Sequence, residues 1–235
     1  MENNTFSIKK VQKRSAEVQA ADVLREAIIS GSIPLGSRLT EISASEQLEV
    51  SRSTIRTAFH QLVQEGLLIQ VPYTGWTVMT LSPEDAWELY TLRSSLEALA
   101  ANLVATQIKE GERVDFIRRS LDEAFLNLKE ACLQAQKRVI ASHDMNLHKK
   151  IVELSGHNRL LDQYTRIQHQ ILIYIQSSNA LMTEPELIIA QHQPLIEALK
   201  AGNVESATKA AILHNETEGE ILVDYLKKHL PFGQI

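Results

Sequence analysis

The sequence has a single cysteine, Cys132, and only nine glycines in 235 residues. One cysteine excludes an internal disulfide and is typical of a protein from a reducing compartment. The glycines form neither a GxxxxGK nor a GxGxxG pattern, so a nucleotide-binding loop is not indicated. No run of about 18 apolar residues occurs, and the N-terminus lacks the apolar segment of a signal peptide. We therefore expect a cytoplasmic protein with no membrane segment.

Aromatic residues make up only 5% of the chain, although apolar residues as a whole make up 44%. Leu, Ile and Ala are abundant, which favours a mainly α protein with an ordinary buried core. The net charge of −5 is uneven, because residues 1–80 carry eight Lys or Arg and eight Asp or Glu. This division predicts an anion-binding head on an acidic body, or alternatively a chance excess of carboxylates on one solvated surface.

Apolar spacing in the first 80 residues predicts three helices followed by a two-stranded β-hairpin. Ser51 is a suitable N-cap for the third helix, because its hydroxyl can accept a hydrogen bond from a free N–H of the first turn. This order of elements is that of a winged helix-turn-helix, so we expect a DNA-binding domain over residues 1–80. The expected helices and strands cover residues 16–30, 41–47, 52–65, 67–71 and 76–79.

The start of the third helix is basic and rich in hydroxyl groups. Arg52, Ser53 and Arg56 lie near its N-terminus, on the side opposite the apolar residues. In a helix-turn-helix this end enters the major groove of double-stranded DNA, where arginine binds guanine and hydroxyls hold phosphates. An ordinary capped surface helix with two solvated arginines is the alternative for this stretch taken alone.

The run from IISGSIPLGSRLTE to VSRSTIRTAFHQLVQEGLLIQVPYTGWTV resembles the DNA-binding domain of the GntR family of bacterial transcription regulators. It departs from the family pattern at Leu35, Ala44, Glu49 and Thr57, where Glu49 takes the place of a usual glycine. The resemblance implies that Arg38 touches phosphate, that the third helix holds the major groove and that the wing reaches the minor groove. The residues implied in the helix and wing contacts are Ser51, Arg52, Ser53, Thr54, Arg56, Tyr73, Thr74 and Gly75.

Residues 81–235 show helical patterns throughout, and we expect them to form an all-helical ligand-binding and dimerisation domain. Ser82 and Pro83, followed by two acidic residues, are a typical helix start. The pattern predicts a bundle of six or seven helices. After the first long helix, the others fit residues 112–131, 135–155, 158–178, 185–201 and 203–229.

Four residues of the bundle are of types that bind divalent metals. Asp144 and His148 are spaced i, i+4, so both side chains can meet one ion from the same helix face. His192 and His214 each lie on a helix beside apolar stretches. Three imidazoles and a carboxylate suit a transition metal such as Zn, Ni or Mn. Core or solvated histidines are the alternative, because a chain with eight histidines shows such a pair by chance.

Residues 84–222 resemble the FCD domain, the all-helical effector domain of one GntR subfamily. The segments that carry the resemblance are LRSSLEALAA, DMNLHKKIVELSGHNRLL and HQPLIEALKAGNVESATKAAILH. In many members an Asp-x-x-x-His pair and two later histidines hold a metal. The resemblance therefore implies that Asp144, His148, His192 and His214 are the metal ligands in this chain.

Four protein ligands leave about two positions of an octahedral ion for a ligand such as a carboxylate. Arg93 is the candidate cation for that carboxylate, and its apolar neighbours indicate a largely apolar setting. Alternatively, Arg93 pairs with Glu97, its i+4 neighbour. We expect the effector to be a small carboxylic acid, such as a hydroxy acid or a sugar acid. The apolar neighbours are Leu89, Leu92, Leu96 and Leu99.

These features predict a ligand-responsive transcription regulator that binds a palindromic operator as a homodimer. A metabolite in the C-terminal domain would change its DNA affinity. One alternative is a metal-dependent hydrolase with an accessory nucleic-acid-binding head, since three histidines and an aspartate can activate water. No further acid, base or nucleophile pattern supports that alternative. The other alternative function is a constitutive architectural DNA-binding protein, whose helical bundle would have no ligand pocket.

Overall fold

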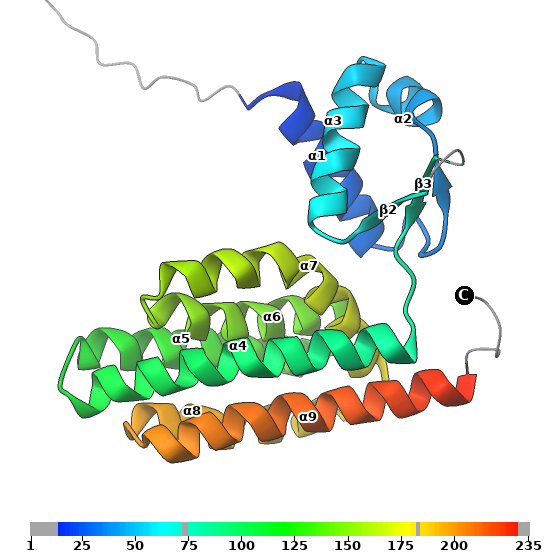
Figure 1. The fold of residues 1–235 in the computed structure, drawn as a ribbon. Helices are drawn as coiled ribbons and strands as arrows, with labels where there is room; N and C mark the ends of the chain where they lie inside the picture. Colours follow the sequence, from blue (N-terminus) through cyan, green and yellow to red (C-terminus); the bar gives the residue numbers. More distant parts are fainter. Residues whose placement is uncertain (1–13, 72–74, 182–183, 230–235) are drawn as a thin grey trace, which may run out of the picture. The chain divides into compact units, whose positions relative to one another are not determined.

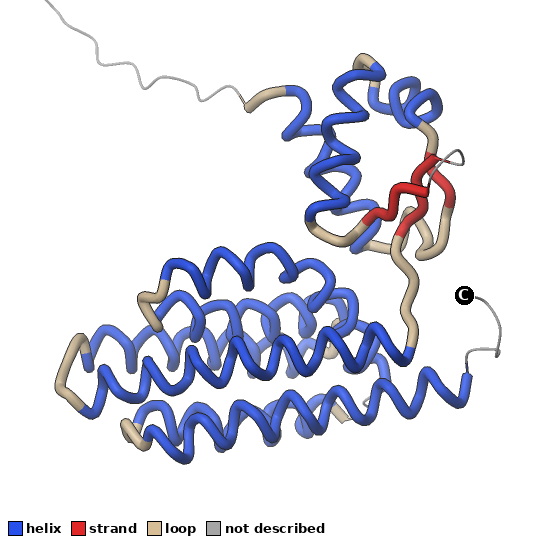
Figure 2. Tube along the Cα trace, in the orientation of Figure 1, coloured by secondary structure: helices blue, strands red, loops and turns tan. Residues whose placement is uncertain are grey.

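The computed structural model describes residues 14–71, 75–181 and 184–229. The chain divides into two compact units, residues 1–78 and 79–235, and each is described by itself (Figure 1). Helices dominate both units, and the strands among the described residues belong to the first unit (Figure 2). None of the helices in these ranges has the length and apolar character that crossing a bilayer requires.

The first unit combines three helices with a small antiparallel sheet. β3 is central in the sheet and pairs with β1 on one side and β2 on the other. β1 adds a third strand to the expected hairpin, and its two residues are too few to show an alternating sequence pattern. The elements are α1 (Ala16–Ile29), β1 (Arg38–Leu39), α2 (Glu41–Leu48), α3 (Arg52–Gln64), β2 (Leu68–Val71) and β3 (Gly75–Val78).

The core of the first unit is built on the apolar face of α3. Ile55, Phe59 and Leu62 on this face are completely buried. Trp76 of β3 packs on Phe59, with the two ring centroids 5.3 Å apart. The opposite face of α3 is left exposed, as the sequence pattern predicts.

Polar caps define the tight connection between α2 and α3. Thr40 caps α2 by accepting a hydrogen bond from the Ser43 N–H at 3.1 Å, and Ser51 caps α3 by accepting one from the Thr54 N–H at 3.1 Å. Glu49 ends α2 with a φ of +53°, in the left-handed region that favours glycine. A glycine at this position would therefore adopt the turn with less strain.

The second unit contains six helices in its described residues. Ser82 caps the first by accepting a hydrogen bond from the Asp85 N–H at 3.0 Å, as expected from the Ser-Pro start. The bounds are α4 (Pro83–Lys109), α5 (Val114–Gln134), α6 (Lys137–Leu154), α7 (Asn158–Leu181), α8 (Pro185–Lys200) and α9 (Val204–His229).

α4 and α9 run antiparallel, side by side along most of their length (Figure 1). They approach closely where α9 has Gly219, because a Cβ there would lie 2.9 Å from the Cβ of Tyr90. α6 and α8 pack against this pair. The inward faces of these four helices therefore meet inside the unit.

Candidate DNA-binding surface and metal centre

The N-terminus of α3 carries a group of hydroxyls next to free backbone N–H groups. The Ser51 Oγ lies 2.8 Å from the Ser53 Oγ and 2.8 Å from the Thr54 Oγ1. Arg52 is exposed at the first position of the helix. Helix N-termini with such donors attract phosphate groups, so this end of α3 is chemically suited to a nucleic-acid backbone.

Two of the three arginines predicted to contact DNA are unpaired in the described part of the head. Neither Arg38, on β1, nor Arg52 forms an ion pair within residues 14–71 and 75–78. Arg56 differs, because both its Nε and its Nη2 donate to the carboxylate of Glu41, at 2.8 and 2.7 Å. The guanidinium of Arg56 is nevertheless on the surface, with 60% of the side chain exposed.

The hairpin of β2 and β3 has four paired positions, from Leu68 and Val78 to Val71 and Gly75. Gly75 starts β3 with a φ of +103°, which side-chain-bearing residues rarely adopt. The predicted wing residues Tyr73 and Thr74 lie outside the described residues.

The four predicted metal ligands come together inside the second unit. Asp144 and His148 extend from α6, His192 from α8 and His214 from α9, and all four are buried. The Nε2 of His148 lies 3.1 Å from the Nε2 of His192 and 3.2 Å from that of His214. The Oδ1 of Asp144 lies 3.4 Å from the Nε2 of His148 and 3.5 Å from that of His192.

These spacings fit the coordination of one divalent ion. With metal–nitrogen bonds of about 2.1 Å, neighbouring ligand atoms lie about 3.0 Å apart around an octahedral ion and about 3.4 Å apart around a tetrahedral one. The buried histidine triad therefore has the geometry to hold a metal ion, and the Asp144 carboxylate is at a suitable distance to join it.

The other ring nitrogen of two of these histidines faces a hydrogen-bond acceptor. The Nδ1 of His192 donates to the Ile188 carbonyl oxygen at 2.7 Å, and the Nδ1 of His148 lies 2.8 Å from the Oε2 of Glu97. Because a carbonyl and a carboxylate accept only, both rings favour a proton on Nδ1. Their Nε2 lone pairs then face each other, and either a proton or a metal ion between them would relieve the repulsion.

The charges around the triad also favour a cation. Burial opposes a charge on His148, but the Glu97 carboxylate outweighs it and raises the pKa of His148 to about 9. Burial, together with His192 and His148, holds the pKa of His214 well below its ordinary value. A metal ion entering the centre would therefore displace a proton from His148.

Glu97 of α4 connects the metal centre to a buried polar cluster. It accepts hydrogen bonds from the Nε of Arg93 at 2.8 Å, the hydroxyl of Tyr164 at 2.6 Å and the Nδ2 of Asn215 at 2.8 Å. Burial raises the pKa of Glu97, but Arg93 and His148 outweigh it and hold that pKa well below its usual range. Glu97 is thus a charged acceptor that orients the His148 ring.

The setting of Arg93 is polar, and the expectation of a largely apolar setting is wrong. Leu92 and Leu99 are 47% and 44% exposed, because they lie on the outer side of α4. Arg93 itself is buried and pairs with Glu97, as the alternative from the sequence predicts, and also with Glu218 at 3.3 Å. Its Nη2 makes no hydrogen bond to the described part of the chain.

Several residues of the cluster were not found from the sequence. Glu218 follows His214 by four positions, and its Oε1 lies 3.7 Å from the His214 Nε2. This is the spacing that singled out Asp144 and His148, so the same rule would have found it. Nothing in the sequence pattern distinguishes Tyr164 from an ordinary core tyrosine.

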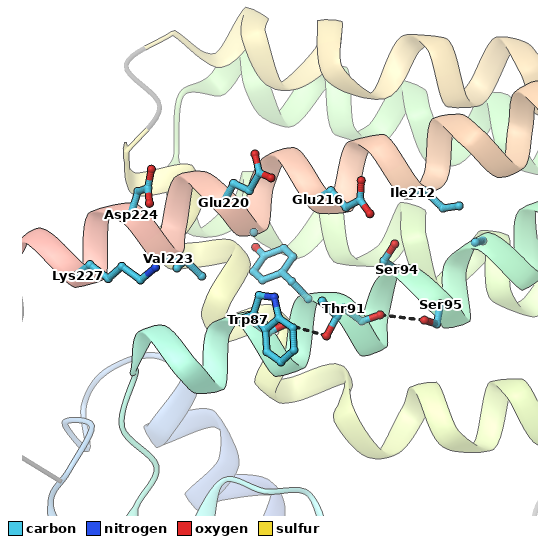
Figure 3. Close-up of a pocket in the computed structure, with 13 residues that line it drawn as sticks. Trp87, Thr91, Ser94, Ser95, Ile212, Glu216, Glu220, Val223, Asp224 and Lys227 are labelled. Carbon is cyan, nitrogen blue, oxygen red and sulfur yellow. Dashed lines mark hydrogen bonds between the residues drawn. The ribbon is translucent and has the colours of Figure 1, made fainter.

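A surface groove of about 690 Å³ lies between α4 and α9 (Figure 3). The exposed Trp87 is on the α4 side, and the acidic side chains of Glu216, Glu220 and Asp224 follow one another along α9. None of the four predicted metal ligands lines the groove. Three carboxylates along one wall repel an anion, so the groove is unsuited to an organic acid.

Comparison with known proteins agrees with both units. The profile of the gntR family of bacterial regulatory proteins matches residues 16–78, and the FCD domain profile matches residues 88–217. The chain belongs to the GntR family and carries an FCD domain. This GntR protein is 27% identical over 207 residues to a probable D-xylose utilization operon transcriptional repressor of Paenarthrobacter nicotinovorans. The aligned residues cover 88% of each chain. It is 26% identical over 229 residues to an Escherichia coli protein named for the L-lactate dehydrogenase operon, covering 87% of this chain and 85% of that one.

Solved structures show the same fold. A GntR regulator from Rhodococcus sp. RHA1 matches with a TM-score of 0.70 at 23% identity, covering 88% of this chain and 97% of that one. The predicted fold, a winged helix-turn-helix followed by an all-helical FCD bundle, is therefore confirmed. The GntR protein is a DNA-binding transcription regulator and not an enzyme, so the hydrolase alternative is not favoured.

Proposed function

We propose that this GntR regulator binds a palindromic operator as a homodimer, and that a small organic acid bound beside a metal ion in the FCD domain changes its operator affinity. The observation that carries the proposal is the convergence of three imidazole Nε2 atoms and the Asp144 Oδ1 inside the bundle. A two-fold protein on two half-sites is the usual arrangement for a helix-turn-helix.

The proposed metal ligands are Asp144, His148, His192 and His214, and the ion is Zn, Ni or Mn. A bound ion of this kind supplies a fixed positive charge and open positions for oxygen ligands. Glu97 and the Ile188 carbonyl support the site by holding two of the imidazoles with Nε2 turned inward. The chain therefore provides both the ligands and the contacts that orient them.

The proposed effector has a carboxylate, and Arg93 is its proposed partner in the protein. The Nη2 of Arg93 is the donor left after the pairs with Glu97 and Glu218 are made. A hydroxy acid or a sugar acid also brings a hydroxyl that can chelate together with the carboxylate. The relative named for the L-lactate dehydrogenase operon supports an effector of this class, because lactate is a 2-hydroxy acid.

In the head, the free arginines and the hydroxyl-rich end of α3 support a role in DNA contact. Repression is the proposed sign of regulation, because relatives are named transcriptional repressors. The proposed contact residues are Arg38, Ser51, Arg52, Ser53, Thr54, Arg56, Tyr73, Thr74 and Gly75.

The test is calorimetric titration of 2-hydroxy acids and sugar acids into metal-loaded and chelator-stripped protein. We expect binding only to the metal-loaded form, and a weaker heat signal with Arg93→Gln. Arg119→Gln, an exposed arginine on α5, is the matched control and should bind normally. An acid that binds equally to both forms would assign the metal a structural role and contradict the mechanism.

A further inference from the structure

Arg56 of α3 forms an ion pair with an acidic residue of the same unit. Its Nε donates to Oε1 of Glu41 and its Nη2 donates to Oε2, at 2.8 and 2.7 Å, so the two planar groups lie side by side. The pair joins the first residue of α2 to the second turn of α3. This contact is distinct from the other ion pairs of the head, which link α1 to the C-terminal end of α3 or lie within the region of α1.

Glu41 is itself held in place from several sides. It lies in the first turn of α2, where the helix dipole favours a carboxylate, and its side chain is only 20% exposed. The hydrogen bond from Arg56 is the largest cause that lowers the pKa of Glu41, and Trp76 and His60 lower it further. The carboxylate is therefore an ionised and fixed support, while the Arg56 side chain reaches the surface.

A guanidinium presents two edges that can each donate two parallel hydrogen bonds. Glu41 occupies the edge formed by Nε and Nη2, which leaves the edge formed by Nη1 and Nη2. An arginine side chain that is otherwise free loses rotamer entropy when it binds. Because Glu41 already orients Arg56, part of this cost is met before DNA arrives.

We propose that Glu41 is a positioning residue that presents the outer edge of Arg56 to a pair of acceptor atoms on DNA. The acceptors are either O6 and N7 of a guanine or two oxygens of a phosphate, both of which match this edge. The inference rests on the proposed DNA contact of Arg56 and adds a residue that would not itself touch DNA.

The proposal predicts that removing the Glu41 carboxylate lowers DNA affinity, whereas simple electrostatics predicts that it raises DNA affinity. Removing a negative charge from a DNA-facing head should strengthen binding to the phosphate backbone. If Glu41 positions Arg56, its removal should instead weaken binding, because a flexible arginine replaces an oriented one. Glu46 offers a matched control, since it is an exposed carboxylate on the same helix with no ion pair among the described residues.

The experiment measures the affinity of full-length protein for a duplex that the wild type selects from a random-sequence pool, and for an unselected duplex. The variants are Glu41→Gln, Glu41→Asp, Glu46→Gln, Arg56→Ala and the double variant Glu41→Gln with Arg56→Ala. Glu41→Asp keeps the charge but shortens the side chain, and it remains informative if Glu41→Gln destabilises the head. Thermal unfolding of each variant checks the fold.

We expect Glu41→Gln and Glu41→Asp to lower affinity for the selected duplex about ten-fold, while Glu46→Gln leaves it equal or slightly higher. Glu41→Gln should have no further effect once Arg56 is Ala. A guanine contact would leave the salt dependence unchanged in Arg56→Ala, and a phosphate contact would lower its slope by about one. The inference is overturned if Glu41→Gln leaves affinity unchanged or raises it as Glu46→Gln does, or if Glu41→Gln weakens binding equally in the Arg56→Ala background. A wild type that enriches no sequence from the pool would contradict the proposed function instead.

Discussion

The Nδ1 of His148 lies 2.8 Å from the Oε2 of Glu97, so a carboxylate on α4 contacts a predicted metal ligand on α6. The same carboxylate accepts hydrogen bonds from Arg93, Tyr164 and Asn215. The ring orientation of His148 therefore depends on four side chains from three other helices. Such supporting contacts commonly matter almost as much to metal affinity as the ligands themselves.

Replacing Glu97 with Gln should lower metal affinity about 10- to 100-fold. The carboxamide of Gln has one acceptor oxygen in place of two. Its NH₂ group would face donors, such as the Nδ1 of His148, that hydrogen-bond to the carboxylate in the wild type. Competition with a chromophoric chelator measures the affinity. Glu205→Gln, an exposed change on α9, is the control, and equal affinities for the two variants would contradict the supporting role of Glu97.

Removing the metal should lower the thermal stability of the FCD domain. A ligand at about 100 times its Kd stabilises the folded state by about 2.7 kcal/mol, and a chelator abolishes that contribution. His192→Ala should abolish the metal-dependent shift in melting temperature, and elemental analysis should find little bound ion. His143→Ala, a half-buried histidine on the same helix as Asp144, should keep both. Wild-type protein that takes up no Zn, Ni or Mn on titration would refute the site.

Arg52→Ala should weaken operator binding by about 1–3 kcal/mol without changing the fold. Arg52 is exposed at the first position of α3 and forms no ion pair among the described residues of the head, so its loss removes a donor without breaking an internal contact. Fluorescence anisotropy with a labelled operator measures the change. Arg119→Ala, which removes the same charge from the FCD domain, should bind DNA normally.

Gly219→Ala should destabilise the contact between α4 and α9 rather than stabilise the helix. In an exposed helix this change stabilises by about 0.5–1 kcal/mol, but here the new Cβ would lie 2.9 Å from the Cβ of Tyr90. Overpacking of this kind costs about 1–3 kcal/mol, so the melting temperature of the domain should fall. Thr217→Ala, at an exposed position of the same helix, is the control. A rise in melting temperature for Gly219→Ala would show that the helices separate without strain.

Much of the fold could be predicted because it depends on local patterns. The face of α3 with Ile55 and Phe59 has clear helical periodicity, and Ser51 and Ser82 are good caps directly before their helices. β1 was not predicted, because its two residues form a strand only through pairing with β3, and the local sequence does not indicate this pairing.

Some features of the candidate site could likewise be predicted from local spacing, and others depend on how the helices pack. Asp144 and His148 are four residues apart on one helix, so their proximity could be predicted from spacing. His192 and His214 were candidates because they lie beside apolar stretches, and the resemblance to the FCD domain implied that all four act together. The burial of Arg93 with Glu97 and Glu218 could not be predicted, because the apolar neighbours Leu92 and Leu99 point outward. Which face of a long helix is buried depends on the helices that pack against it.

The placement of the four ligand residues along the chain has a consequence for synthesis on the ribosome. The first unit ends at residue 78, well before Asp144, and the last ligand, His214, comes from the final helix. Domains form in the order in which they leave the ribosome. A nascent or truncated chain that ends before α9 can therefore contain the whole DNA-binding unit while it lacks a complete metal centre. Such a product would carry the proposed DNA contacts of the first unit without the proposed effector site.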